Sequence, residues 1–176
     1  MGYLDRRQNA LTGAPVAELE KLLATIAHCF DEPWLSQKNE HPLQLLWKRR
    51  DGLATCELFL LGDSILKMGG PADPWVRGQV KKVRHGDANG RRGALFEIFG
   101  LGLFVTPGVS VQPTAASNPG YDGVVQFPSG AKLFVSVKAY GPSTHLVLSI
   151  RKPFRVTVDG LKGPGERVSD ERDQLG

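Results

Sequence analysis

Apolar residues recur at helical spacing through the first half of the chain. From Pro15 to Phe30 they return every three or four positions with charged residues between them, which is the pattern of an amphipathic helix. The apolar run from Leu53 to Met68 predicts a second long helix, with Asp51 as its N-cap and Gly69-Gly70-Pro71 as its end. The N-terminal part of the chain is therefore predicted to be helical.

A third, basic helix is expected next, because Asp73-Pro74 supplies an N-cap and a first-turn proline for a run that reaches about Arg84. Residues 31–42 are polar and contain two prolines, so we expect a loop there, followed by a helical turn or two within 43–50. The glycine-containing residues 85–90 predict a flexible break.

The composition changes at residue 93. Residues 94–104 are apolar nearly all the way round, which predicts a helix that is buried on most sides. Five strand-like runs follow, at residues 109–112, 123–127, 132–140, 145–150 and 154–158. The second and third are joined by Pro128-Ser129-Gly130, a good hairpin loop. The predicted order from residue 93 to residue 140 is helix, strand, strand, strand.

The overall composition narrows the class of protein. The chain has 176 residues, 41% of them apolar, so a single domain with a substantial core is expected. Its net charge of +4 favours an anionic partner such as nucleic acid, although many basic proteins have no such partner. No apolar stretch is long enough to span a membrane, and the start does not read as a secretory signal. We expect a cytoplasmic protein with no membrane partner.

Two isolated carboxylates stand out in the C-terminal half. Between Gly93 and Ala131 the charged residues are Glu97 and Asp122 alone, and both have apolar or neutral neighbours. Burying a lone carboxylate costs several kcal/mol unless a cation or hydrogen-bond donors compensate it. The alternative is that Glu97 faces solvent or pairs with a nearby arginine, Arg91 or Arg92.

Lys138 is the natural third member of this group. Side chains alternate along a strand, so Phe134, Ser136 and Lys138 share one face of the run 132–140. Folding the hairpin places Asp122 across from about Val137 or Lys138. The alternative is a cross-strand ion pair on a solvated face.

These residues resemble a known motif. The stretch PGYDGVV at 119–125, followed by LFVSVK at 133–138, is similar to the motif of the PD-(D/E)XK, or restriction-endonuclease-like, nuclease superfamily. That motif has an acidic residue at the start of one strand and an acid-x-Lys triplet on the next, and the preceding helix often supplies a glutamate, here Glu97. The resemblance covers residues 91 to about 140.

The resemblance implies an α/β fold with a restriction-endonuclease-like core, in which a helix precedes a mixed three- to four-stranded sheet, behind an N-terminal helical extension. The expected regions are a helical region at 1–90, the nuclease-like core at 91–160 and a flexible tail at 161–176.

The resemblance also implies metal-dependent hydrolysis of phosphodiester bonds in DNA, with RNA as an alternative. Asp122, Glu97 and the Val137 carbonyl would bind Mg²⁺ or Mn²⁺. Lys138 would orient or deprotonate the attacking water and steady the developing negative charge, and Ser136 would hold a metal-bound water. The resemblance also leaves a homodimer as an alternative to a monomer, because nucleases that cut both DNA strands often act as dimers.

One departure from the motif leaves the activity open. Ser136 stands where the family usually has Asp or Glu, and a hydroxyl brings no charge to a hard cation. The chain is therefore either an active nuclease or an inactive relative that binds nucleic acid or a protein partner. A helical interaction module, in which both carboxylates form structural ion pairs, is a further alternative.

A cluster of basic residues precedes the predicted core. Its spacing would suit a phosphate backbone, and an ordinary solvated face is the alternative. Its members are Arg77, Lys81, Lys82, Arg84, Arg91 and Arg92.

Overall fold

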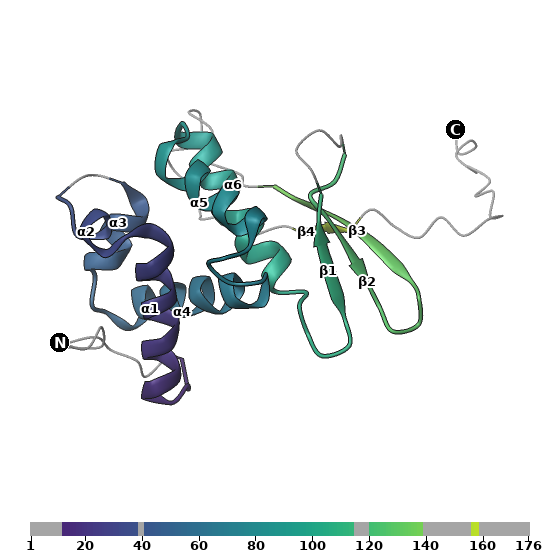
Figure 1. Ribbon diagram of the computed structural model, residues 1–176, viewed down its shortest axis with the longest axis horizontal. Helices are drawn as coiled ribbons and strands as arrows, with labels where there is room; N and C mark the ends of the chain where they lie inside the picture. Colours follow the sequence, from purple (N-terminus) through teal and green to yellow (C-terminus); the bar gives the residue numbers. More distant parts are fainter. Residues whose placement is uncertain (1–11, 39–40, 115–119, 139–155, 159–176) are drawn as a thin grey trace, which may run out of the picture.

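The computed structural model describes residues 12–38, 41–114, 120–138 and 156–158, and within these ranges it has an α/β fold (Figure 1). Six helices precede a four-stranded sheet. The elements are α1 (Val16–Phe30), α2 (Glu32–Leu35), α3 (Pro42–Lys48), α4 (Gly52–Lys67), α5 (Pro74–His85), α6 (Ala88–Gly102), β1 (Ser110–Pro113), β2 (Gly123–Gln126), β3 (Lys132–Val137) and β4 (Val156–Val158). The helices predicted between residues 15 and 84 are confirmed. The predicted tail and the strand-like run at 145–150 lie outside the described residues.

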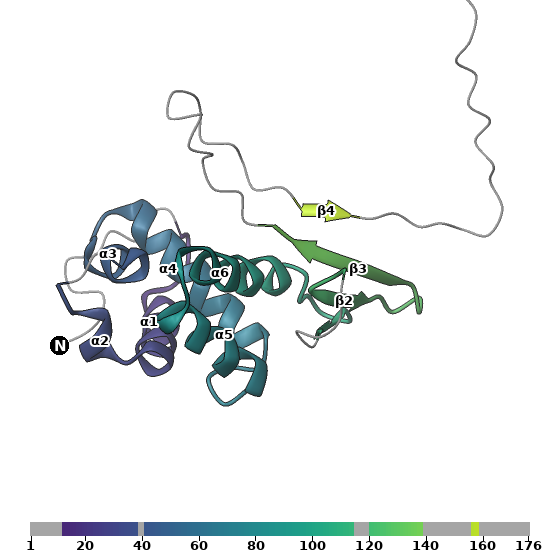
Figure 2. The ribbon, with the colours of Figure 1, turned by 90° about the horizontal axis from the view of Figure 1, so that it is seen from above.

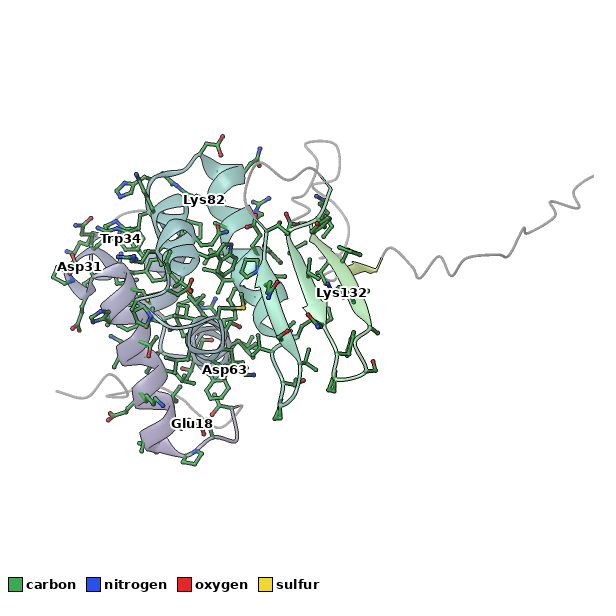
Figure 3. The ribbon with its side chains drawn as sticks, turned by 45° about the vertical axis from the view of Figure 1, so that its right-hand side comes forward. Glu18, Asp31, Trp34, Asp63, Lys82 and Lys132 are labelled. Atoms are coloured by element: carbon green, nitrogen blue, oxygen red, sulfur yellow. The ribbon has the colours of Figure 1, made fainter. Side chains whose placement is uncertain are left out.

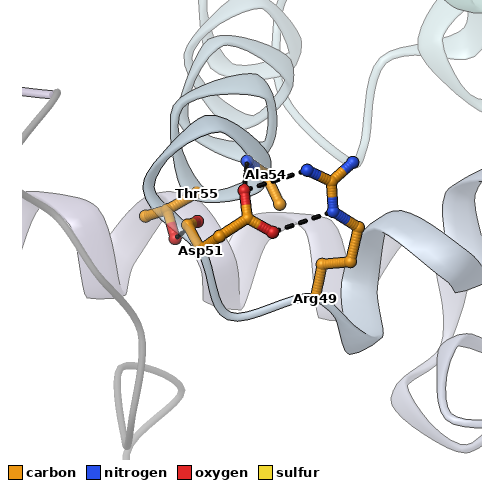
Figure 4. A network of polar contacts seen from close by, with 4 residues as sticks. All are labelled: Arg49, Asp51, Ala54 and Thr55. Atoms are coloured by element: carbon orange, nitrogen blue, oxygen red, sulfur yellow. Dashed lines mark hydrogen bonds and ion pairs between the residues drawn. The ribbon is translucent and has the colours of Figure 1, made fainter.

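Helix caps formed by aspartates define the starts of α4 and α5, as predicted. The Asp51 carboxylate accepts a hydrogen bond from the Ala54 N–H at 3.0 Å, and it also binds the Arg49 guanidinium at 2.8 and 2.9 Å (Figure 4). The hydrogen bonds from Arg49 and then from Ala54 lower the pKa of the Asp51 carboxyl to about 2. Asp73 accepts from the N–H groups of Trp75 and Val76 at 2.8 and 3.0 Å. These bonds satisfy donors that a helix start leaves unpaired.

Two predicted irregular segments contain helix instead. The expected loop at 31–42 includes the single-turn α2, whose first turn accommodates Pro33 because that position needs no N–H. The break predicted at 85–90 is shorter than expected and comprises only residues 86 and 87, between α5 and α6. Asp87 accepts from the Gly90 N–H at 2.7 Å and caps α6, so residues 88–90 are already helical.

Helix α6 links the helical part of the chain to the sheet (Figures 1 and 2). It packs against α4, α5 and β3. Ile98 and Leu101 on this helix are fully buried, whereas Leu95 and Phe99 are half-buried and Leu103 is exposed, so the predicted burial on most sides is confirmed only in part. One continuous cluster of buried side chains extends from α1 to β3, and the boundary predicted between residues 90 and 91 falls in the first turn of α6.

The sheet has the order β1-β2-β3-β4, and each described pair of neighbouring strands is antiparallel. The prediction of a mixed sheet is wrong for this part of the chain. β2 and β3 are consecutive and joined by a tight turn, which is compatible only with antiparallel pairing. Gly123 pairs with Val135, so Asp122 stands opposite Ser136, one position short of the predicted Val137.

The two faces of β3 have different surroundings. Val135 and Val137 are buried on the face toward α6, where the Val137 Cγ2 atom would lie 2.8 Å from a Cβ placed on Gly100. Phe134 and Lys138 are exposed on the other face, as the predicted alternation requires. Ser136 belongs to that second face by register but is buried. The Val137–Gly100 contact therefore holds α6 directly against the end of β3.

Among the described helices, none combines the length and apolarity that crossing a bilayer requires.

Candidate functional site

The candidate site lies where α6, the start of β2 and the end of β3 meet. Glu97 is one helical turn before Gly100, whose backbone packs against Val137. The same contact brings Glu97 within electrostatic reach of Asp122, which precedes β2, and of Lys138, which follows β3. Asp122 and Lys138 thus both act electrostatically on Glu97, and the described hydrogen bonds and ion pairs join none of the three residues to another.

The Glu97 carboxylate is held on one side. Its Oε2 atom accepts a hydrogen bond of 2.6 Å from Nε2 of Gln79, on α5. Partial burial raises the pKa of the Glu97 carboxyl, the charge of Lys82 opposes the rise, and the negative charge of Asp122 adds to it. The Gln79 hydrogen bond and the charge of Lys138 also act to lower this pKa.

The other Glu97 oxygen, Oε1, accepts no hydrogen bond from the described residues. It is also not one of the buried polar atoms left without a partner, so it is accessible to solvent. One carboxylate oxygen is therefore fixed by the protein, and the other is open to a ligand.

Asp122 has the same division between a held and an open oxygen. Its Oδ2 atom accepts a 2.6 Å hydrogen bond from the Val137 N–H and a longer one, 3.4 Å, from the Ser136 hydroxyl. Its own N–H donates to the Val135 carbonyl at 2.7 Å. The other carboxylate oxygen, Oδ1, accepts no hydrogen bond from the described residues. It is not among the buried polar atoms without a partner, so it too is accessible to solvent. These bonds fix Asp122 to the end of β3.

Ser136 and Lys138 flank this carboxylate differently. Ser136 is 8% exposed and reaches Asp122 only at the long end of the hydrogen-bond range. Lys138 is exposed, so its ammonium group is available to an anionic ligand. The described ion pairs are Arg49–Asp51 and Lys67–Asp63, and the cross-strand ion pair between Asp122 and Lys138 considered as an alternative is not among them.

The candidate metal ligands in the described residues are two carboxylates, Glu97 and Asp122. Within the described ranges, no three His, Cys, Asp or Glu side chains gather as a metal-binding group. Mg²⁺ commonly binds through one or two carboxylates and keeps several waters, so it does not need a third protein carboxylate. The open oxygens Oε1 of Glu97 and Oδ1 of Asp122 are donors of that kind, and the Val137 carbonyl oxygen is the neutral ligand predicted with them.

The predicted basic residues separate into two groups. Arg77, Lys81, Lys82 and Arg92 are exposed, and Lys82 lies on the helical side of the molecule (Figure 3). Arg84 and Arg91 are half-buried, and the Arg84 guanidinium stacks 5.1 Å from the centre of the Trp34 ring. Glu97 is hydrogen-bonded to Gln79, and it pairs with neither Arg91 nor Arg92 among the described contacts. The exposed group is the one available to phosphates.

The cysteines do not contribute to the site. Both are free, and burial raises the pKa of the Cys29 thiol to about 11, which makes it a poor nucleophile. The residue that the sequence analysis missed is Gln79. It carries no charge, and its only signal was a polar residue beside Val76, Val80 and Val83 on the apolar face of α5.

Comparisons with protein-family models, with curated proteins and with solved structures find no match for this chain. Its function is therefore argued from the site itself.

Proposed function

We propose that the chain is a metal-dependent nuclease with a restriction-endonuclease-like core that hydrolyses phosphodiester bonds in DNA. The observation that carries the proposal is the packing of α6, which bears Glu97, against the end of β3, where the Val137 N–H holds Asp122 and Lys138 follows. Each of the two carboxylates has one oxygen that the described residues leave without a donor. The order of α6, β1, β2 and β3 supports it, because the motif residues fall at the helix, the strand start and the strand end that the family resemblance requires.

The electrostatics of the site favour a bound cation. Burial raises the pKa of Glu97 and the negative charge of Asp122 adds to the rise, while the charges of Lys82 and Lys138 oppose it. A neutral residue in place of Glu97 or Asp122 would avoid the cost of ionising Glu97 beside Asp122, and carboxyl groups with a raised pKa, such as that of Glu97, cluster at functional sites. A divalent cation between the two open oxygens would offset both the repulsion and the desolvation.

The protein groups have distinct roles in this mechanism. Glu97 Oε1 and Asp122 Oδ1 would hold Mg²⁺ or Mn²⁺, which when bound polarises the phosphate and lowers the pKa of a coordinated water. Lys138 donates to a phosphate oxygen or to the attacking water and stabilises the charge that develops in the transition state. The Val137 N–H keeps Asp122 in place, and the Ser136 hydroxyl, 3.4 Å from the same carboxylate oxygen, would orient a water beside it. The exposed Lys81 and Lys82 contact the DNA backbone.

Cleavage of supercoiled plasmid and single-stranded DNA with Mg²⁺ or Mn²⁺ tests the proposal. We expect Asp122→Asn and Lys138→Met each to lower the cleavage rate by at least about a hundredfold. Lys132→Met is the matched control, because Lys132 is an exposed lysine at the other end of β3. This variant should cleave at the wild-type rate. RNA is tested as a second substrate, and direct conversion of plasmid to linear product would support a homodimer acting on both strands.

A second candidate is an inactive relative that binds nucleic acid without cutting it. Two observations favour it: Ser136 replaces the usual acid, and Asp122 Oδ2 is already occupied by the Val137 N–H. In that case the wild type would not cleave with either metal, yet it would bind DNA with an affinity that falls steeply with salt. Lys82→Met should then reduce the slope of log affinity against log salt by about one. If the wild type neither cleaved DNA nor bound it in a salt-sensitive way, the helical interaction module would be the remaining alternative.

The proposed activity and the free thiols of Cys29 and Cys56 accord with the expected cytoplasmic location.

A further inference from the structure

A buried glutamine lies behind the candidate site. Gln79 is 2% exposed, and its Nε2 donates to Glu97 Oε2 at 2.6 Å. Its own Oε1 atom is buried and has no hydrogen-bond partner among the described residues. An apolar residue would fill this position on α5 without leaving an amide oxygen unpaired, so the packing of α5 against α6 does not by itself explain the glutamine.

A second buried glutamine shows what is particular to Gln79. Gln44 is also fully buried, its Nε2 also donates one hydrogen bond, and its Oε1 also lacks a partner. Gln44 binds the backbone carbonyl of Trp34 at 2.7 Å, which fixes α3 to the α2 turn. Gln79 instead binds an ionisable side chain of the site. The two amides are thus equivalent in burial and differ in what they hold.

We infer that Gln79 is a positioning residue, whose amide fixes Glu97 Oε2 so that Oε1 remains the oxygen available to a divalent cation. The inference rests on the proposed function, because it assigns Gln79 to the same metal site. It goes beyond that function by extending the site to α5, an element outside the part of the chain that carries the motif resemblance.

The neutrality of the amide is part of this role. The charged groups that act on Glu97 are Lys82 from α5, Asp122 from the start of β2 and Lys138 from the end of β3. A lysine or arginine at position 79 would pair with the carboxylate and compete with a bound cation. The amide restricts the rotation of the Glu97 side chain and leaves its full negative charge for the cation, as partners behind metal ligands commonly do.

Mn²⁺ binding to the full chain, followed by electron paramagnetic resonance, tests the inference without relying on activity. Gln79→Met should raise the Kd for Mn²⁺ by about tenfold or more. Gln44→Met is the matched control, since it removes an equally buried amide at comparable cost to folding, and its Kd should stay within about twofold of the wild type. Circular dichroism would establish that both variants are folded.

The outcomes separate the two proposals. Tight Mn²⁺ binding by the wild type and unchanged binding by Gln79→Met would overturn the role of Gln79 and leave the proposed function standing. An absence of Mn²⁺ binding by the wild type would overturn both. If Gln79→Met does not fold, a nuclear magnetic resonance measurement on the wild type alone tests the role of Gln79. Saturation with Mg²⁺ should shift the side-chain amide resonances of Gln79 and leave those of Gln44 in place, and an unmoved Gln79 amide would overturn the inference.

Discussion

His41 is buried at the start of α3, where its ring makes two contacts with the backbone. Nδ1 accepts a hydrogen bond from the Leu43 N–H at 3.2 Å, and Nε2 lies 2.8 Å from the Val83 carbonyl oxygen. Together these contacts require a neutral ring with its proton on Nε2. Burial lowers the pKa of His41, the hydrogen bond to Val83 opposes this, and the charge of Arg91 lowers it further. At the scale of a residue, this histidine serves folding, and it joins α3 to α5.

The lowered pKa of His41 predicts acid sensitivity. The unfolded chain takes up this proton near the ordinary value of about 6.5, and the folded chain does so only at lower pH. The contribution to stability is therefore complete above about pH 6.5 and is lost as the pH falls toward the folded-state pKa. Urea unfolding between pH 7.5 and 5 should show a declining free energy of unfolding, and His41→Asn, which keeps a capping side chain, should show a smaller decline.

An exposed histidine provides the control for this effect. His28→Asn should leave the pH dependence of the wild type unchanged. If the free energy of unfolding in the wild type does not change over this pH range, the neutral-ring assignment is wrong.

Residue type determined what the sequence could reveal of the site. Glu97 and Asp122 were predictable because a carboxylate in an apolar run is conspicuous. Gln79 was not, because its partner is 18 positions away on another helix and becomes a neighbour only when α5 packs on α6. The long Ser136–Asp122 bond and the filled Oδ2 of Asp122 depend on register to a fraction of an ångström, which periodicity does not resolve.

At the scale of an element, α6 combines poor helix formers with close packing. A Cβ placed on Gly102 would lie 2.5 Å from the Ser64 Cβ and 2.8 Å from its Cα, where α6 crosses α4. Glycine within a helix costs about 0.5–1 kcal/mol relative to alanine, so its presence needs a compensating contact. The close crossing is that contact.

Two substitutions on α6 should therefore act in opposite directions. Gly102→Ala should destabilise the fold by about 1–3 kcal/mol, because the contact includes the backbone of α4 and cannot relax easily. Gly93→Ala, at a position with open space around it, should stabilise the fold by up to about 1 kcal/mol. Denaturant unfolding of both variants would measure this, and an increase in stability from both would show that the crossing is not tight.

The elements differ in how far the sequence could predict them. The long helices α1, α4 and α5 follow closely from periodicity and the caps at Asp51 and Asp73. The single-turn α2 was missed, because four residues are too few for a periodic signal. The first turn of α6 was missed because Gly90 suggested that the break after Gly86 continued, whereas the Asp87 cap starts the helix at Ala88. Strand direction was misjudged through the family resemblance rather than through the strand pattern.

At the scale of the whole molecule, the helical region and the sheet share one core. The same cluster contains Leu23 and Phe30 of α1, Ile98 and Leu101 of α6, and Val135 of β3. Neither side of the predicted boundary at 90 and 91 would retain its packing alone, because α6 is buried between α4, α5 and the sheet.

Fragments provide the test at this scale. We expect residues 1–90 and residues 91–176, produced separately, to lack cooperative unfolding transitions, because each exposes apolar surface that α6 buries in the full chain. Mixing the two fragments should restore part of the helical circular dichroism signal. A fragment 91–176 with a sharp thermal transition of its own would instead establish an independent core domain.

The contact between Gly100 and Val137 belongs to the framework that supports the candidate site. Gly100 has no side chain and that of Val137 is unreactive, although the Val137 N–H also holds Asp122. The Gly100–Val137 contact keeps α6, which carries Glu97, against the end of β3. Descendants of one ancestor would therefore be able to exchange an acid for Ser136, or the reverse, without rebuilding the fold. If the proposed activity were lost and regained along such a lineage, Gly100 and Val137 would stay in place, and they would identify relatives more reliably than the proposed catalytic residues.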